Sequence, residues 1–466
     1  MSAEAADLVR RARQTARAGA GARAGAGRRP RIVVFNVKHS ENVGDGVIAE
    51  CIEAAIGDAL PGARVETLDL AGRTAYARPA AATQGTLARR AALGLLHRLP
   101  PAARRPLVRA ALAGRLARLR PRWAAALAGA DLAVIGGGNL LQDDCLNFPL
   151  KIAAAADAIA RAGVPAAVLG VGVSGGWSAP ARRLFASLER LDLRCASVRD
   201  EASRRAWAEA FGDRLPPAAL CRDPGLLAAR LLFAPPCDAG PTALPDPGRR
   251  VGLCVTHPAV LRHHASSRDA VAGGGSRFYA ETCRALLAGG GTVALFTNGA
   301  REDHDLARVV LRRPELQEAR RARRLALAPR PVRPRDLVAA IAGFDAVVAH
   351  RLHASIVAHA LGRPAVGLGW DRKVEGFFAS VDRAAFVLRG REATPPAIAR
   401  RVADALRDGV DARARDRAVR EADTAVRACL APLAIAAAPP AAALANKGER
   451  TAARFQEAPA ADAPVW

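Results

Sequence analysis

The stretch DAVVAHRLHASIVAHALGRPAVGLG, residues 345–369, decides the fold of this chain. Short apolar runs occupy 345–349 and 365–369, and the residues between them, about 352–361, have the pattern of a helix. Two short apolar strands joined by one helix form a βαβ unit, whose strands run parallel and are buried on both faces. The stretch therefore predicts part of a parallel sheet that is covered by helices.

The same alternation continues on both sides of this stretch. A Pro- and Gly-rich segment, 234–249, divides it into two halves and has the composition of a linker. We therefore predict an α/β fold of two doubly wound, Rossmann-like domains that face each other across a cleft. The expected parts are a disordered basic tail at 1–30, an N-terminal domain at 31–233 with a basic helical insertion at about 72–127, the linker, a C-terminal domain at 250–430 and a disordered Ala/Pro-rich tail at 431–466.

The composition narrows the possible partners. The net charge is +25, and Lys38, Lys151, Lys373 and Lys447 are the only lysines, so almost all basic residues are arginine. GC-rich coding accounts for such arginine content without any function, and anionic partners such as phosphorylated substrates or lipid headgroups are the other explanation. Aromatic residues make up 4% of the chain and no nucleic-acid-binding motif occurs, so we expect no specific nucleic acid partner.

The cysteine pattern, the N-terminal composition and the length of the apolar runs indicate the cellular compartment of the protein. Eight cysteines are scattered without a CxxC pair, which favours free thiols in a reducing environment over disulfides or a zinc site. The first residues lack the apolar core of a secretion signal, and no apolar run reaches the ~18 residues of a membrane-spanning helix. We expect a cytoplasmic protein.

The first motif that could carry chemistry is the segment Asn42–Gly46, NVGDG, which follows the first expected strand. Glycine allows the backbone to approach a ligand, and the start of the following helix offers N–H groups to an anion. Asp45 could orient a sugar hydroxyl or a basic side chain. The alternative is that Asn42 or Asp45 only caps the helix.

Two further glycine-rich segments follow expected strands. Gly136, Gly137, Gly138 and Asn139 would suit a backbone that admits a ligand closely, and would equally suit a tight turn. The segment 170–175, which contains Gly172, matches GxGxxG. It lies in the middle of its domain and not in the first βα turn, so a ligand-facing loop is favoured over a dinucleotide site.

The fourth motif lies inside the opening stretch, where a strand end meets a helix start. It contains His350, Arg351, His353 and Ser355. The arginine fork matches carboxylate or phosphate, and histidine suits general acid–base catalysis. Lys373 follows the next strand and could reach the same crevice. The alternative is an arginine that pairs with a neighbouring carboxylate beside packed histidines, and the spacing does not favour a metal site.

The basic stretch 89–122 contains ten arginines and no acidic residue, interleaved with Leu and Ala. Its composition suits a helix pair that lies on an anionic membrane surface, which would give the protein a peripheral membrane contact. A solvated arginine-rich insertion explains it equally well.

In this order, the motifs resemble the polysaccharide pyruvyl transferase family over about 31–390. The last block is the most specific, because Arg-x-His, a Gly-x-Pro turn and a downstream lysine recur together in that family. Trp370 stands where the family often has Tyr. The stretches that carry the resemblance are ENVGDGVI at 41–48, VIGGGNL at 134–140, LGVGVSG at 169–175, SVRDEAS at 197–203, RDPG at 222–225 and AHRLHASIVAHALGRPAVGLGWDRKVEGFF at 349–378.

The resemblance implies a fold like that of two-lobed GT-B glycosyltransferases, phosphoenolpyruvate as donor and a sugar as acceptor, free or lipid-linked. Pyruvate would become a ketal on the sugar, and phosphate would leave. By analogy Arg351 would hold the donor, assisted by Lys373, and His353 would protonate the enol carbon or assist phosphate departure. Asp45 would accept the proton of the sugar hydroxyl, and no metal or other cofactor is implied. We place His350 and Ser355 in the donor site, and Asn42, Gly44, Gly136, Gly137, Gly138, Asn139 and Gly172 on the acceptor side or in its loops.

Two other functions remain open from the sequence. A nucleotide-sugar glycosyltransferase on a similar scaffold would typically use a glutamate for the ribose, where this chain offers Arg, His and Lys. A non-enzymatic protein that binds membranes or nucleic acid would use 1–30 and 89–122, and it would have no turnover to lose when they are deleted.

Overall fold

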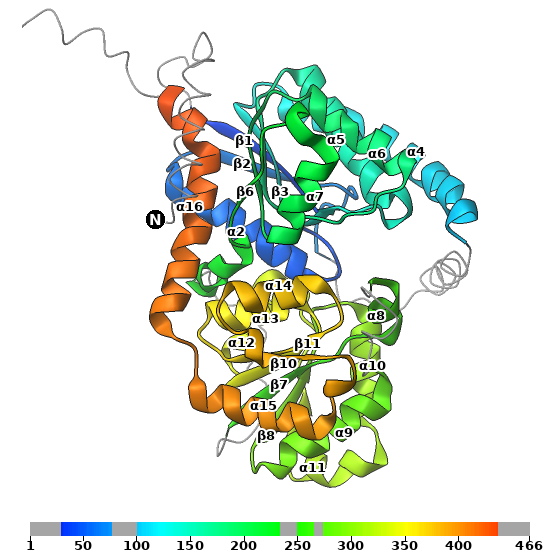
Figure 1. Ribbon diagram of the computed structural model, residues 1–466, viewed down its shortest axis with the longest axis vertical. Helices are drawn as coiled ribbons and strands as arrows, with labels where there is room; N and C mark the ends of the chain where they lie inside the picture. Colours follow the sequence, from blue (N-terminus) through cyan, green and yellow to red (C-terminus); the bar gives the residue numbers. More distant parts are fainter. Residues whose placement is uncertain (1–28, 77–99, 234–248, 265–273, 437–466) are drawn as a thin grey trace, which may run out of the picture.

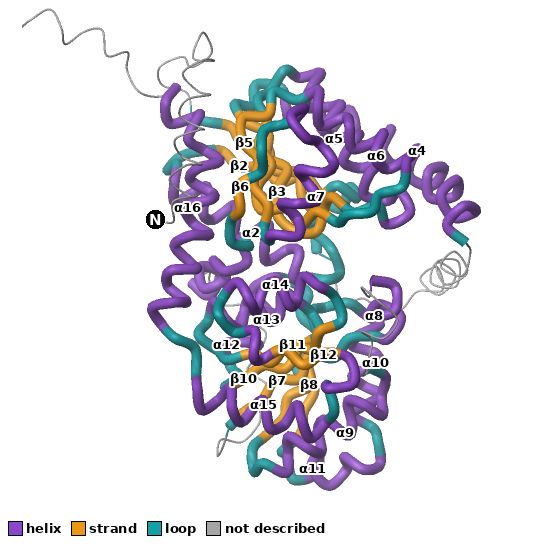
Figure 2. The backbone as a smooth tube through the Cα atoms, viewed as in Figure 1, coloured by secondary structure: helices purple, strands orange, loops and turns teal. Residues whose placement is uncertain are grey.

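The chain forms two α/β lobes, one above the other (Figure 1, Figure 2). The computed structural model describes residues 29–76, 100–233, 249–264 and 274–436. Each lobe is built on a six-stranded sheet in which all the paired strands run parallel, with the orders β2-β1-β3-β4-β5-β6 and β12-β11-β10-β7-β8-β9. The predicted fold class, two doubly wound parallel sheets, is therefore confirmed.

Helices cover both faces of the N-terminal sheet. The elements of this lobe are β1 (Arg31–Asn36), α2 (Val43–Ala59), β2 (Arg64–Asp69), α4 (Pro101–Leu127), β3 (Leu132–Leu141), the 3-10 turn η1 (Asp144–Leu146), α5 (Asn147–Ala162), β4 (Ala166–Val173), α6 (Ala179–Phe185), β5 (Leu193–Val198), α7 (Glu201–Phe211), β6 (Ala219–Leu220) and the 3-10 segment η4 (Pro224–Phe233).

The C-terminal lobe repeats the arrangement. Its elements are β7 (Arg250–Cys254), α8 (Pro258–His264), α9 (Gly275–Ala288), β8 (Thr292–Phe296), α10 (Arg301–Leu311), α11 (Gln317–Arg321), β9 (Leu325–Leu327), α12 (Pro334–Ala342), β10 (Ala346–Ala349), α13 (Leu352–Ala360), β11 (Ala365–Gly369), α14 (Arg372–Ser380), β12 (Val387–Arg389), α15 (Pro395–Asp408) and α16 (Ala412–Ala436).

Small aliphatic residues build the sheets, as the composition requires. The central strands β4 and β10 are buried along their whole length, because helices pack on both of their faces. Glycine provides the closest contacts: a Cβ on Gly137 would lie 2.1 Å from Cγ2 of Ile48 in α2, and Gly137 has a φ of 71°. Gly137 therefore brings β3 and α2 together, which is a packing role, whereas a Cβ on Gly138 would meet open space.

The last helix of the chain, α16, returns to the N-terminal lobe. It follows α15 of the C-terminal lobe and then packs on α2, β4 and β5, along the side of the upper lobe in Figure 1. Two ion pairs of 2.7 Å, Arg222–Glu421 and Arg230–Asp423, fasten it there. The prediction that a disordered tail begins at 431 is wrong for 431–436, because this helix continues to Ala436. Residues 437–466 lie outside the described part.

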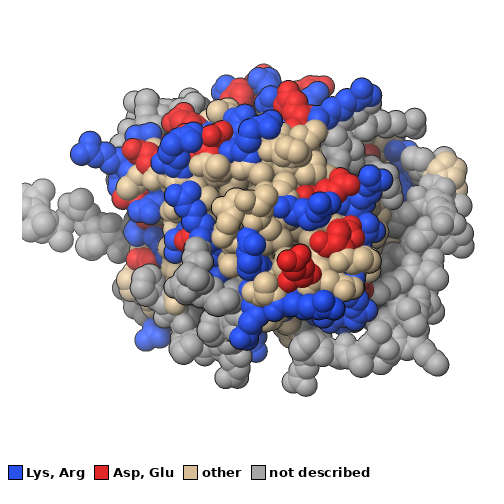
Figure 3. Space-filling model, turned by 90° about the horizontal axis from the view of Figure 1, so that it is seen from below, with Lys and Arg blue, Asp and Glu red and all other residues tan. Residues whose placement is uncertain are grey.

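The basic insertion includes α4, which packs on α5 through one apolar face. Leu112, Leu116, Trp123 and Leu127 of α4 are buried, while most of its arginines face solvent. This is one helix, and the remainder of the predicted basic helix pair lies outside the described residues, as do 1–28 and most of the expected linker, 234–248. Basic and acidic side chains are interleaved on the face of the molecule in Figure 3.

Candidate active site between the lobes

The starts of α2 and α13 meet at the junction of the lobes. A Cβ on Gly44 would lie 2.7 Å from both Cβ and Nδ1 of His353, so only glycine allows this approach. Beside it, the amide of Val43 donates a 2.8 Å hydrogen bond to the carbonyl of Asn298 in the other lobe. The structure thus brings the two predicted motifs together, and Gly44 is where they touch.

The helix α2 begins at Val43, so Gly44 and Asp45 belong to its first turn and not to a loop before it. Asn42 precedes the helix, but its side chain makes no capping hydrogen bond. Asp45 lies inside the helix and has a side-chain hydrogen bond from Ser40. Neither residue acts as the simple cap that the sequence left open.

Asp45 faces the imidazole of His353, with 3.8 Å between Oδ1 and Nδ1. Burial raises the pKa of Asp45 to about 6, against the opposing effect of the Ser40 hydrogen bond and of the cations Arg73, Arg351 and Lys373. A carboxyl with this pKa can exchange a proton near neutral pH, which is a requirement for a general base.

The imidazole of His353 is electrically neutral in the unliganded protein. Burial, and next the positive charges of Arg199, Lys373 and Arg351, together lower the pKa of His353 to about 3. Its Nε2 is buried and has no hydrogen-bond partner among the described residues. A neutral imidazole with one unsatisfied nitrogen, surrounded by cations from both lobes, is an environment that an anionic ligand would complete.

Arg351 is paired before any ligand binds. Its Nε and Nη2 donate to Oδ2 of Asp303 at 3.1 and 2.6 Å, and the other oxygen of that carboxylate accepts from the amide of His257 at 2.7 Å. The guanidinium is therefore held in one orientation, with the edge that carries Nε committed to Asp303.

Two residues predicted for the donor site lie inside the C-terminal lobe instead of on a cavity wall. The Nδ1 of His350 is 3.0 Å from the hydroxyl of Tyr279, and its carbonyl accepts a 2.6 Å hydrogen bond from Trp370. Burial, and next the charge of Arg351, lower the pKa of His350 to about 3, so it is neutral. Ser355 is fully buried in α13. Both positions have the environment of packed core residues. Neither lines the cavity between the lobes, and neither do Asp45, Arg351 and His353, which lie at the junction of α2 and α13.

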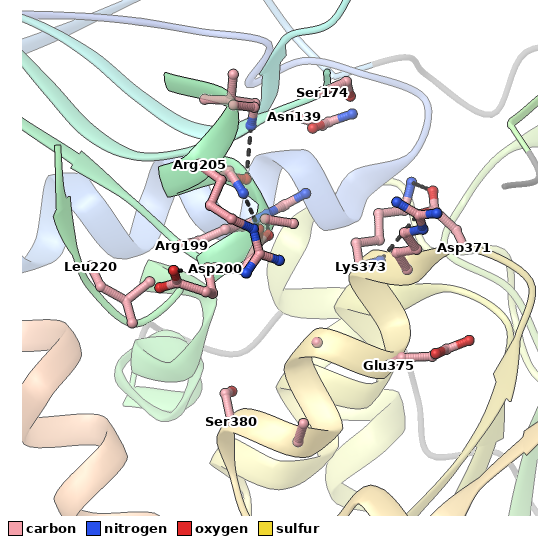
Figure 4. A pocket seen from close by; sticks show the side chains of 18 of the residues that line it. Asn139, Ser174, Arg199, Asp200, Arg205, Leu220, Asp371, Lys373, Glu375 and Ser380 are labelled. Atoms are coloured by element: carbon pink, nitrogen blue, oxygen red, sulfur yellow. Dashed lines mark hydrogen bonds and ion pairs between the residues drawn. The ribbon is translucent and has the colours of Figure 1, made fainter. Parts of the chain in front are cut away.

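A cavity of about 1370 Å³ lies between the lobes beside this junction (Figure 4). Its upper wall comes from the ends of β3, β4 and β5 and from α7, and its lower wall from the start of α14 and from β12. Asn139, Ser174 and Arg199 line the upper wall, and Lys373, Glu375 and Arg389 line the lower one.

Arg199 is the functional candidate that the sequence did not single out. It follows β5, its side chain is 5% exposed, and its nearest carboxylate oxygens lie at 3.5 Å (Asp223) and 3.6 Å (Asp200). Its Nε has no hydrogen-bond partner among the described residues. A Cβ on Gly172 would lie 2.7 Å from Nη2 of Arg199, so the GxGxxG glycine makes room for a side chain. The sequence did contain one signal for Arg199, because this residue directly follows the end of an expected strand.

Lys373 faces Arg199 across the cavity in Figure 4, at the start of α14. Its Nζ lies 2.8 Å from Oδ2 of Asp371 and 5.0 Å from the centre of the Trp370 ring. The ring thus forms a wall behind the ammonium group and holds it by a cation–π contact. On the opposite side, Asn139 donates a 2.8 Å hydrogen bond to Gln142.

One family model covers residues 42–372, more than half of the chain. The chain belongs to the polysaccharide pyruvyl transferase family. The matched segment contains Asp45, Arg199, Arg351 and His353, and it ends one residue before Lys373. No curated protein sequence matches this chain.

Several solved structures are similar to this chain at low identity. The UDP-GlcNAc 2-epimerase of Methanocaldococcus jannaschii has 10% identity and a TM-score of 0.44, covering 84% of this chain and 99% of that one. The putative UDP-N-acetylglucosamine 2-epimerase of Listeria monocytogenes has 10% identity and a TM-score of 0.46, covering 88% and 95%. The ADP-heptose LPS heptosyltransferase II of E. coli has 16% identity and a TM-score of 0.34, covering 81% and 99%.

Within the described residues of this pyruvyl transferase family member, no group of three or more His, Cys, Asp or Glu side chains could hold a metal ion. The cysteines of that part are all free thiols. None of the helices there is long and apolar enough to cross a membrane.

Proposed function

We propose that this protein transfers the pyruvyl group of phosphoenolpyruvate to a sugar, forming a pyruvate ketal and releasing phosphate. The observation that carries the proposal is that the positive charges of Arg199, Arg351 and Lys373, from both lobes, all lower the pKa of the His353 imidazole, which lies 3.8 Å from Asp45. Phosphoenolpyruvate has a carboxylate and a phosphate on adjacent atoms, so it needs several cations in a small space.

Binding of phosphoenolpyruvate would also make His353 able to donate a proton. The cations that hold the pKa of His353 down to about 3, after burial itself, are those that an anionic donor would neutralise. With the donor bound, the pKa of the imidazole rises and it can carry a proton. His353 then delivers this proton to the methylene carbon of the donor, which leaves an oxocarbenium-like centre at the adjacent carbon.

The acceptor completes the reaction in two additions. A sugar hydroxyl attacks the cationic carbon, and Asp45 takes the proton of that hydroxyl. The bond from this carbon to the phosphate oxygen then breaks, phosphate leaves, and a second hydroxyl of the sugar adds with loss of its proton. The products are a ketal, in which the methylene has become a methyl group, and inorganic phosphate. Arg199, Arg351 and Lys373 stabilise the negative charge on the phosphate that leaves.

The test uses the purified full-length protein with phosphoenolpyruvate and a panel of sugar acceptors. We expect phosphate release that depends on the acceptor, and a pyruvate ketal on the acceptor by mass spectrometry and proton NMR. His353→Gln should lower turnover by at least ~100-fold, the usual contribution of a general acid. The matched control is His359→Gln on the same helix, whose ring packs on Phe377 away from the cavity. Turnover with nucleotide sugars in place of phosphoenolpyruvate would instead identify a glycosyltransferase.

A further inference from the structure

The segment RDPG, residues 222–225, carries part of the family resemblance but has no role in the reaction proposed above. It follows β6 at the edge of the N-terminal sheet, and Arg222 lines the cavity between the lobes. Proline at 224 disfavours a helical backbone at the residue before it, and in an extended backbone neighbouring side chains point to opposite sides. Arg222 and Asp223 can therefore contact different parts of the molecule.

Asp223 contacts the cation of the N-terminal wall. Its Oδ2 lies 3.5 Å from Nη1 of Arg199, and its Oδ1 accepts a 2.9 Å hydrogen bond from the amide of Gly225. A Cβ on Gly225 would lie 3.1 Å from Cγ2 of Ile356, so glycine lets the segment pack against α13, the helix that carries His353. The segment is thus fixed relative to Arg199 and to α13.

Arg222 contacts the opposite wall of the cavity. Its Nη1 donates to the carbonyl of Ser380, the last residue of α14, and its Nε donates a 2.7 Å hydrogen bond to Glu421 of α16. Ser380 and Glu421 line the same cavity as Arg222. One side chain of the N-terminal lobe therefore holds both a helix of the C-terminal lobe and the returning helix α16.

Lys373 lies near the start of α14 and Ser380 at its end, as Figure 4 shows. The two residues are seven positions apart, which is about 10 Å along a helix axis. Because α14 also packs on β11, the bond from Arg222 holds this side of the C-terminal lobe against the N-terminal one. If the lobes turned by about 10° about this bond, Lys373 would move by about 2 Å relative to Arg199. Such a shift exceeds the distance range of a hydrogen bond.

We propose that Arg222 is a positioning residue for the donor: by holding the end of α14, it sets the distance between Lys373 and Arg199 across the cavity. The inference rests on the proposed function, in which these two cations bind phosphoenolpyruvate. A small donor with two anionic groups requires cations at a fixed separation, so a change in that separation weakens its binding.

The groups that move protons are held by other contacts. Asp45 and His353 meet at the junction of α2 and α13, where the amide of Val43 bonds the carbonyl of Asn298. Loss of Arg222 should therefore weaken donor binding and spare the proton-transfer groups and the acceptor. A general loss of folding would affect all of them.

The first test measures binding of phosphoenolpyruvate to the full-length protein by calorimetry, without an acceptor. Arg222→Met should weaken binding about fivefold, and Arg222→Lys should retain most of the affinity because an ammonium group can donate to the same partners. The matched control is Arg230→Met. Arg230 also fastens α16 through a 2.7 Å ion pair, to Asp423, but lies outside the described lining of the cavity.

The control separates positioning of α14 from docking of α16. Unchanged affinity in Arg222→Met, or an equal loss of affinity in Arg230→Met, overturns the proposal. If Arg222→Met does not fold, Arg222→Gln decides by the same criteria.

A double-variant comparison tests whether Arg222 acts through Lys373. If it does, Arg222→Met combined with Lys373→Met should bind phosphoenolpyruvate about fivefold more weakly than the wild type, as each single variant does. Two independent contributions would multiply to about 25-fold, and that result overturns the positioning role.

Kinetics and hydrogen exchange complete the test. In Arg222→Met the KM for phosphoenolpyruvate should rise, while kcat and the KM for the acceptor stay within about twofold of the wild type. An equal rise in both KM values overturns the proposal.

Hydrogen exchange of the α14 amides, measured without any ligand, should be faster in Arg222→Met and unchanged in Arg230→Met. Unchanged exchange in Arg222→Met also overturns the positioning role. Absence of phosphoenolpyruvate binding by the wild type contradicts the proposed function itself, and the exchange measurement still decides whether Arg222 holds α14.

Discussion

Arg199 of the N-terminal lobe and Arg351 of the C-terminal lobe act on the same imidazole, yet they are held very differently. Arg351 makes two hydrogen bonds to Asp303, the longer of 3.1 Å, whereas Arg199 approaches no carboxylate closer than 3.5 Å. Both side chains are almost buried, at 13% and 5% exposed. The difference therefore lies in how the charge is compensated and not in how far it is buried.

This contrast indicates a division of labour across the cleft. The C-terminal lobe fixes its cation in advance, which fits a rigid donor platform. The N-terminal lobe holds Arg199 only through the longer contacts to Asp223 and Asp200, so this guanidinium is more available to a ligand. A firmly paired cation on one side and a weakly paired cation on the other would let substrate binding draw the two lobes together.

The largest effect should come from breaking the Arg351–Asp303 pair. Arg351→Met leaves Asp303 buried without a cation, and we expect a loss of about 3–5 kcal/mol of unfolding free energy. Arg199→Met should cost only about 1 kcal/mol, because its contacts are long. Denaturant unfolding of both variants measures the difference, and adding Asp303→Asn to Arg351→Met should restore part of the loss. Equal losses of unfolding free energy in Arg351→Met and Arg199→Met would show that the protein holds the two arginines equally firmly.

A smaller effect concerns the carboxyl that faces His353. The pKa of Asp45 is raised from 3.8 to about 6, so the folded protein binds this proton more tightly than the unfolded chain does. Its contribution to stability is therefore largest below pH 4 and is lost as the pH rises toward 6. Asp45→Asn should remove this loss and make the protein about 1–3 kcal/mol more stable than the wild type at pH 8.

Turnover gives the second readout for Asp45. If it accepts the proton of the acceptor, the turnover of the wild type rises as the pH increases through about 6, where Asp45 ionises. The turnover of Asp45→Asn should be low and should lack this rise. A variant that keeps the wild-type pH profile would remove Asp45 from the base role and leave it as a packing partner of His353.

The smallest effect should follow from changing Lys373, which is partly exposed and already paired with Asp371. We expect Lys373→Met to raise the KM for phosphoenolpyruvate about fivefold, equivalent to roughly 1 kcal/mol, and to leave stability nearly unchanged. Lys373→Arg should retain most of the affinity, since it keeps the charge. If Lys373→Met raises the KM for phosphoenolpyruvate as much as Arg199→Met does, the two side chains contribute equally to donor binding.

The fold was predictable because its signal is local. The strand and helix pattern of 345–369 places β10, α13 and β11 to within one residue of their observed bounds. The meeting of Asp45 with His353 was also within reach, since the carboxyl ends of parallel strands form the ligand crevice.

What the sequence did not provide depends on partners far along the chain. Nothing near Arg351 indicates that Asp303 binds it, and nothing near His350 indicates that Tyr279 does. Arg199 was missed for the same reason, because its proximity to His353 exists only once the two lobes are docked. The pairing of charges depends on tertiary structure. The sequence could therefore identify the reactive residue types, but it could not show which of them already have a hydrogen-bond or ion-pair partner within the protein.

The return of α16 to the first lobe has a consequence for how the protein is made. Part of the surface of the N-terminal lobe is covered only by residues 412–436. These residues are synthesised after the rest of the C-terminal lobe. We therefore expect the first lobe to complete its folding only when synthesis is nearly finished, and a chain truncated before Ala412 to expose the uncovered apolar surface of α2 and η4 to aggregation.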